Sequence, residues 1–208
     1  MTDTVDTPAP TPRLYLASAS PRRRELLTQI GLAHEVLLAP APPGEDEPWH
    51  AGESAADYVR RTARDKALRG RDWMRGQGLP RLPLLAADTT VILAGDVLGK
   101  PADRDDAMRI LRALSGSAHE VHTAVAVWTG DQLLEAVSIT EVRMRELSAE
   151  EIARYCDSGE PFGKAGAYGI QGLAGAFISH IAGSYTGVMG LPLFETAKLL
   201  REAGIQIP

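Results

Sequence analysis

The chain has one cysteine, few aromatic residues and no apolar run long enough to span a bilayer. The single cysteine, Cys156, excludes an internal disulfide framework and a cysteine-rich zinc site, and it favours a reducing environment. Aromatic residues make up 5% of the chain and the net charge is −5, without the basic and aromatic stripe that nucleic-acid binders use. We therefore expect no signal peptide and a cytoplasmic location. We also expect neither a membrane nor a nucleic acid as a partner.

The 208 residues are 44% hydrophobic, which is enough to bury a full core. Residues 1–12 are rich in Thr, Pro and Asp and predict a disordered tail, with a single domain over residues 13–208. Apolar patterns predict an α/β fold with a mixed, twisted sheet and flanking helices, because a long hairpin interrupts the alternation of strands and helices. The expected strands are 14–17, 35–38, 84–93, 121–128, 133–144 and 177–181. The expected helices are 21 to about 30, 53–68, 105–114, 148–156 and 192–203, with an irregular segment or insertion at 70–83.

Three arginines occupy the first turn of the helix expected after Ser20-Pro21. Ser20 suits the N-cap and Pro21 the first helical position, but a first turn normally prefers acids because of the helix dipole. Arginines there are explained by a strong anion bound among them. Solvated surface arginines are the alternative, which the Ser-x-Ser-Pro-Arg-Arg pattern on a strand-to-helix turn disfavours. We therefore predict a polyphosphate site formed by Ser18, Ser20, Arg22 and Arg23.

Asp88 interrupts an otherwise apolar strand, followed by Thr89. A lone buried carboxylate is costly unless it is paired, protonated or bound to a metal. An aspartate that caps a neighbouring loop is the alternative. Lys100 follows on a Gly-Lys-Pro turn, so this segment combines a carboxylate with a cation that can bind phosphate.

Glycine recurs at every third position from Gly163 to Gly175, and this predicts a loop whose backbone approaches a ligand closely, with Lys164 and Gln171 as its useful side chains. Gly95 to Lys100 does not match a Walker A loop, because its spacing is short and Pro101 replaces the Ser or Thr. His119 and His122 are interpreted as surface residues, and Trp49, Trp73 and Trp128 as packing residues.

The chain resembles the Maf family of nucleoside triphosphate pyrophosphatases over nearly its whole length from Leu14. The resemblance rests on blocks that occur in family order: 17–27, 58–67, 87–89, 99–101, 114–116, 159–161, 164–172 and 183–193. It implies a Maf/ITPase-like fold with a deep nucleotide-binding cleft. It also implies dependence on a divalent metal, Mg²⁺ or Mn²⁺, and hydrolysis of a nucleoside triphosphate to the monophosphate and pyrophosphate, a house-cleaning role in nucleotide metabolism.

The same resemblance implies roles for individual residues. Asp88 corresponds to the proton acceptor, and Glu47, Lys66 and Lys100 correspond to metal and phosphate partners, with Glu47 and Asp88 as metal ligands. Arg22, Thr89 and Gln171 fall where the branch that acts on dTTP and UTP has residues that set substrate choice. Two alternatives stay open: a nucleotide-binding regulator of septum formation without significant turnover, and a 7-methyl-GTP-type pyrophosphatase. The sequence does not fix the oligomeric state, and a homodimer is compatible with it.

Overall fold

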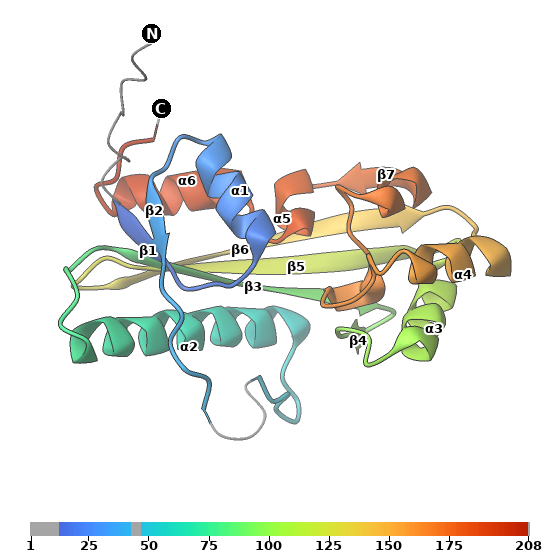
Figure 1. Ribbon diagram of the computed structural model, residues 1–208, viewed down its shortest axis with the longest axis horizontal. Coiled ribbons are helices and arrows are strands. Elements are labelled where there is room, and N and C mark those ends of the chain that lie inside the picture. Colours follow the sequence, from blue (N-terminus) through green and yellow to red (C-terminus); the bar gives the residue numbers. More distant parts are fainter. Residues whose placement is uncertain (1–12, 43–46, 208) are drawn as a thin grey trace, which may run out of the picture.

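One mixed sheet organises the chain, which we describe from a computed structural model for residues 13–42 and 47–207. Residues 1–12, where the sequence predicts a disordered tail, lie outside the described residues. The sheet has the strand order β2-β1-β3-β5-β6-β7, with β4 paired to β3 (Figure 1). Its strands are β1 (Leu14–Leu16), β2 (His34–Val36), β3 (Leu84–Leu93), β4 (Asp96–Leu98), β5 (Ala118–Trp128), β6 (Leu133–Met144) and β7 (Ile178–Ala182).

β1 runs parallel to β2 and β3, whereas β3, β5 and β6 form an antiparallel meander. The β5–β6 hairpin predicted from the sequence is confirmed, and it makes the sheet mixed. β1 pairs with β3 only as far as Leu85, and β4 begins its pairing at Val91. In the described part of the chain, the intervening residues of β3 therefore have no strand neighbour on that edge.

The helices are α1 (Pro21–Gln29), α2 (Ala55–Gly76), α3 (Arg104–Leu114), α4 (Ala149–Asp157), α5 (Tyr185–Met189) and α6 (Leu193–Glu202), with short 3₁₀ turns η1 (Ala165–Ala167) and η2 (Leu173–Phe177). α2 covers one face of the sheet, and α1 and α6 cover the other (Figure 1). α3 and α4 pack together at the far end of the sheet, beside η1 and η2. This arrangement confirms the mixed α/β fold with flanking helices.

The prediction of an irregular segment at 70–83 is wrong for its first half, because α2 continues to Gly76. Gly70, where the irregular segment is predicted to begin, is buried inside the helix against β3. A Cβ at this position would lie 2.8 Å from Leu84 Cδ1, so the missing side chain lets α2 approach the sheet. Met74, one turn later, is 3% exposed and continues the apolar face of α2.

The structure differs from the prediction at several other places. β2 covers His34–Val36 rather than 35–38, and Phe177 belongs to η2 rather than to β7. The prediction missed α5 (Tyr185–Met189), a helix of five residues. His119 and His122 are buried at 3% and 6% exposure, so their interpretation as surface residues is wrong. No helix in residues 13–42 and 47–207 combines the length and apolar character needed to cross a bilayer.

Candidate active site

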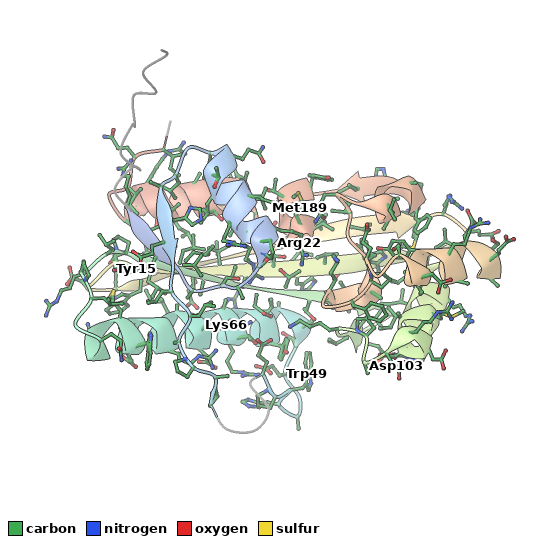
Figure 2. All side chains as sticks on the ribbon, viewed as in Figure 1. Tyr15, Arg22, Trp49, Lys66, Asp103 and Met189 are labelled. Carbon is green, nitrogen blue, oxygen red and sulfur yellow. The ribbon has the colours of Figure 1, made fainter. Side chains whose placement is uncertain are left out.

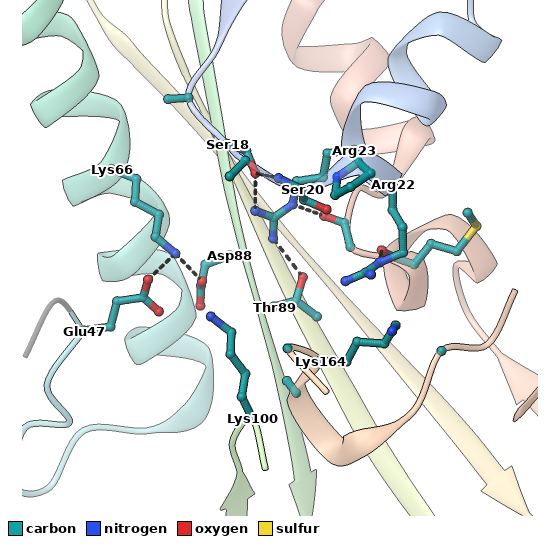
Figure 3. Close-up of a pocket in the computed structure, with 18 of the residues that line it drawn as sticks. Ser18, Ser20, Arg22, Arg23, Glu47, Lys66, Asp88, Thr89, Lys100 and Lys164 are labelled. Atoms are coloured by element: carbon teal, nitrogen blue, oxygen red, sulfur yellow. Dashed lines mark hydrogen bonds and ion pairs between the residues drawn. The ribbon is translucent and has the colours of Figure 1, made fainter. Parts of the chain in front are cut away.

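A cavity of about 520 Å³ opens beside the unpaired edge of β3. Its other lining residues come from the β1–α1 turn and the start of α1, the segments after β2 and β4, α2, β5, the glycine-rich segment and the end of α5. All eleven site residues predicted from the sequence line this cavity: Ser18, Ser20, Arg22, Arg23, Glu47, Lys66, Asp88, Thr89, Lys100, Lys164 and Gln171. Their chemical roles stay predictions, but the fold brings all of them together (Figure 3).

The N-terminus of α1 meets the cavity with no acid in its first turn. Ser20 occupies the N-cap and Pro21 follows it, as the sequence predicts, but the Ser20 side chain makes no capping hydrogen bond. Ser18 Oγ instead accepts the Ser20 backbone N–H at 3.2 Å. A helix N-terminus with arginines and no acids favours an anion, because backbone N–H groups and the helix dipole add to the charge of the side chains.

Arg22 and Arg23 play different parts at this helix start. Every guanidinium nitrogen of Arg23 donates within the protein: Nε to Gly190 O at 2.8 Å, Nη1 to Ser18 Oγ at 3.1 Å and Nη2 to Thr89 Oγ1 at 3.3 Å. Burial lowers the pKa of Arg23, and the charge of Asp88 opposes this shift. Arg23 therefore ties α1 to β3 and to the end of α5. Arg22 makes a longer contact, from Nε to Met189 O at 3.4 Å. Figure 2 shows Arg22 beside Met189.

The opposite side of the cavity, which we call the acidic wall, consists of Glu47, Lys66 and Asp88. Asp88 is 6% exposed on β3, and Lys66 reaches it from α2 with Nζ 2.7 Å from Asp88 Oδ1. The same ammonium group lies 2.5 Å from Glu47 Oε1 (Figure 3). Lys66 thus bridges two carboxylates from different segments, which compensates the burial of Asp88.

Side chains of α2 hold the segment that carries Glu47. Tyr58 Oη donates to the Glu47 carbonyl at 3.2 Å, and Arg61 Nη2 donates to the Pro48 carbonyl at 2.7 Å. The Trp49 and Tyr58 rings lie 4.7 Å apart. Burial, followed by the charges of Asp88 and Glu47, raises the pKa of Tyr58 to about 12, so its hydroxyl stays protonated as a donor. Trp49 is 43% exposed, so this contact packs it at the surface.

Arg22, Arg23 and Lys164 form what we call the basic wall, opposite the acidic wall. Burial and the nearby Arg22 charge lower the pKa of Lys164, an effect partly opposed by Glu160. Lys100 follows β4 and extends toward Asp88 between the two walls (Figure 3). Its neighbour Gly99 accepts a backbone hydrogen bond from Gly166 at 3.1 Å, which connects the Lys100 turn to the glycine-rich segment.

The acidic wall offers the oxygen ligands that Mg²⁺ and Mn²⁺ prefer. Within residues 13–42 and 47–207, no three or more His, Cys, Asp and Glu side chains converge in a way that could hold a metal ion. Two carboxylates completed by substrate phosphates are nevertheless a common Mg²⁺ environment. Asp88 and Glu47 therefore fit a divalent metal that is bound together with a polyphosphate. Glu45 and Asp46, also acidic in this loop, lie outside the described residues.

Several lining residues were not identified from the sequence. They are mainly small or apolar, and they include Leu37, Leu38, Val91, Val121, Tyr168, Val188 and Met189. Apolar residues in strands carry no signal that separates cavity lining from core. Arg69 also lines the cavity, three residues after Lys66, and this helical spacing is the one signal that could have indicated it.

The fold and the cavity define a mixed α/β protein with a cavity lined by arginines, lysines and carboxylates at the edge of β3. The sequence pattern of the family described as Maf-like protein matches residues 13–203, and the chain belongs to the Maf family. A relative from Bordetella parapertussis (strain 12822) is 76% identical over 197 residues, which cover 95% of each chain. Relatives from Chromobacterium violaceum and Ralstonia nicotianae are 56% and 54% identical over 94% and 97% of this chain, and over 97% and 99% of their own lengths. All three bear the name dTTP/UTP pyrophosphatase.

Proposed function

We propose that this protein hydrolyses nucleoside triphosphates, dTTP and UTP above all, to the monophosphate and pyrophosphate in the cytoplasm. The observation that carries the proposal is the cavity, in which a buried carboxylate and its lysine face an arginine-bearing helix start. The names of the relatives support the substrate class, since the chain is 76% identical to one of them over 95% of its length.

The basic wall and Lys100 bind the triphosphate in this proposal. Arg22 contacts the phosphates directly, because its hydrogen bond to Met189 O is long at 3.4 Å, whereas each guanidinium nitrogen of Arg23 has an acceptor within the protein. The backbone N–H groups at the start of α1 add further donors, since the Ser20 side chain does not cap them. Arg23 fixes the position of this helix start relative to Thr89.

The acidic wall supplies the base. Asp88 accepts the proton of the water that attacks the α-phosphorus, and Lys66 moves from its carboxylate partners to the phosphate charge that develops. A Mg²⁺ or Mn²⁺ ion held by Asp88, Glu47 and the phosphates would neutralise charge on the leaving pyrophosphate. The bond between the α-phosphorus and the bridging oxygen breaks, and pyrophosphate leaves.

A pyrophosphate-release assay tests the proposal. The purified protein is incubated with dTTP, UTP, dCTP, ATP and 7-methyl-GTP, with Mg²⁺ or Mn²⁺ and with EDTA as the metal-free control. We expect pyrophosphate from dTTP and UTP and little with EDTA. Release of single phosphates would overturn the reaction, and faster turnover of 7-methyl-GTP would overturn the substrate class. Binding of dTTP without turnover would indicate a nucleotide-binding regulator instead.

A further inference from the structure

The glycine-rich segment folds around one carboxylate, that of Glu160. Its oxygens accept the backbone N–H of Leu173 at 2.9 Å, the N–H of Ala174 at 3.2 Å and the hydroxyl of Tyr155 at 2.9 Å. Leu173 and Ala174 begin η2, which has no side-chain cap of its own. Glu160 thus satisfies N–H groups that the start of this turn would otherwise leave unpaired.

Gly172 shows how closely the chain wraps this carboxylate. A Cβ at Gly172 would lie 2.6 Å from Glu160 Cδ, so a side chain would displace the carboxylate. The sequence pattern predicted that these glycines let the backbone approach a ligand. At Gly172 the group approached is a side chain of the protein itself.

Tyr155 and Glu160 connect this centre to the cavity. The Tyr155 hydroxyl donates to Glu160 and accepts the backbone N–H of Gly169 at 3.2 Å. The Glu160 carbonyl accepts a hydrogen bond from Lys164 Nζ. Gly169 and Lys164 line the cavity together with Gln171, whereas Tyr155 and Glu160 are not among its lining residues. Both ends of the segment that carries Lys164 and Gln171 are therefore fixed from behind the cavity wall.

We propose that Tyr155 and Glu160 are positioning residues, which set Lys164 and Gln171 against the bound nucleotide. The inference rests on the proposed function, because it concerns how that substrate is held. Tyr155 is 3% exposed, and its ring packs edge-on against Phe177 with centroids 5.2 Å apart. A Tyr155→Phe variant keeps this packing and removes only the hydroxyl that joins Glu160 to Gly169.

The experiment compares the parent with Tyr155→Phe, Glu160→Gln and Glu160→Ala. Tyr185→Phe, an exposed tyrosine on α5, and Glu150→Gln, an exposed glutamate that pairs with Arg154, are the matched controls. We expect KM for dTTP to rise about tenfold or more in Tyr155→Phe and Glu160→Gln, with kcat within about twofold, because Lys164 and Gln171 act on binding. The rise in KM should be larger in Glu160→Ala than in Glu160→Gln, since glutamine retains one acceptor oxygen. The controls should match the parent.

Amide hydrogen exchange of the nucleotide-free protein gives a readout that does not depend on turnover. The N–H groups of Gly169, Leu173 and Ala174 should exchange faster in the variants, while those of β3 stay as in the parent. Failure of the parent to hydrolyse any triphosphate would overturn the proposed function. The exchange data would still test whether Tyr155 and Glu160 hold the glycine-rich segment. An active parent whose Tyr155→Phe and Glu160→Gln variants keep the parental KM would overturn the positioning role. Exchange that rises across the whole sheet together with a fall in kcat would show that the two residues are general stability elements.

Discussion

The two walls of the cavity differ in whether their charges are compensated within the protein. On the acidic wall, Lys66 pairs with both Glu47 and Asp88, so the charges largely compensate one another within the protein. On the basic wall, the hydrogen bonds that Arg22, Arg23 and Lys164 donate within the described residues go to carbonyl and hydroxyl oxygens and not to carboxylates. The basic wall therefore lacks a compensating negative charge among its own described contacts.

Under the proposed function, this difference predicts which wall changes when substrate binds. An anion on the basic wall compensates three cations that repel one another, so it can bind without breaking an ion pair. A metal ion on the acidic wall must compete with Lys66 for the same oxygens. The two events assist each other if Lys66 transfers to the phosphates as the metal arrives. The ion pairs of the acidic wall then rearrange on binding, whereas the basic wall can bind an anion without rearrangement.

Asp88→Asn should have the largest effect on this comparison. The change removes the proposed base, which accounts for about 10²–10⁴-fold in rate. It leaves Lys66 paired with Glu47 alone, so the melting temperature should change by only a few degrees, about 2–4 °C per kcal/mol for a protein of this size. Steady-state pyrophosphate release and thermal melting measure the two quantities. Asp96→Asn, at the exposed first residue of β4, is the control. Near-parental turnover in Asp88→Asn would place the base elsewhere, with Glu47 as the first candidate.

Arg22→Ala should weaken binding on the basic wall with little loss of stability. A hydrogen bond to a charged group contributes about 1.5–3 kcal/mol, which corresponds to roughly a 10- to 150-fold rise in KM for dTTP. Removal of an arginine from the first turn of α1 also relieves a small repulsion with the helix dipole. Arg24→Ala, on the same helix but not lining the cavity, provides the control for charge. Equal KM values in the two variants would show that Arg22 does not contact the substrate.

Lys66→Met should let the acidic wall bind a metal ion before nucleotide is present. Without the ammonium group, Glu47 and Asp88 repel each other, so the variant should be less stable than the parent in EDTA. Mn²⁺ should then bind without nucleotide, about tenfold more tightly than to the parent, and restore the melting temperature. Calorimetric titration with Mn²⁺ alone checks this. Weaker Mn²⁺ binding in the variant would contradict the competition between Lys66 and the metal.

The smallest effect concerns pH and the contact of His119 with a residue that lines the cavity. His119 Nε2 lies 2.8 Å from the hydroxyl of Tyr168, a cavity residue, and burial lowers the pKa of His119 to about 4. An unfolded histidine binds a proton near pH 6.5, so this group stabilises the fold fully above pH 6.5 and loses that contribution as the pH falls toward 4. At pH 5.5 the parent should be about 1 kcal/mol less stable than at pH 7.5 through this group.

Urea unfolding of the parent and of His119→Gln at both pH values measures the difference. The pH dependence should shrink in His119→Gln, since glutamine does not titrate and can still reach Tyr168. His180→Gln, an exposed position on β7, should keep the parental dependence. An unchanged pH dependence in His119→Gln would mean that other groups cause it.

Local chemistry could be predicted from the sequence, and contacts between distant segments could not. The arginine turn and the Asp88 strand each lie within a few residues, and their local patterns were sufficient to predict these elements. The continuation of α2 past Gly70 depends on Leu84, which the chain reaches only after the helix has ended. The burial of His119 depends on a tyrosine 49 residues away. Likewise, Lys66 joins three segments through its ion pairs with Glu47 and Asp88. The sequence could assign these residues to one site, but it could not predict which of them pair.

The missing strand neighbour beside the middle of β3 limits how this cavity can change in evolution. Leu85 O accepts the Ala17 N–H, so the peptide groups of alternate residues, Ala87 and Thr89, face the same edge. Residue replacement alters side chains and, apart from proline, leaves these peptide groups in place. Thr89 also lines the cavity, so part of the surface that meets a ligand is the same whatever residue is encoded there. Divergence of specificity within such a fold is therefore confined to side chains, while the peptide groups of the strand edge stay in place.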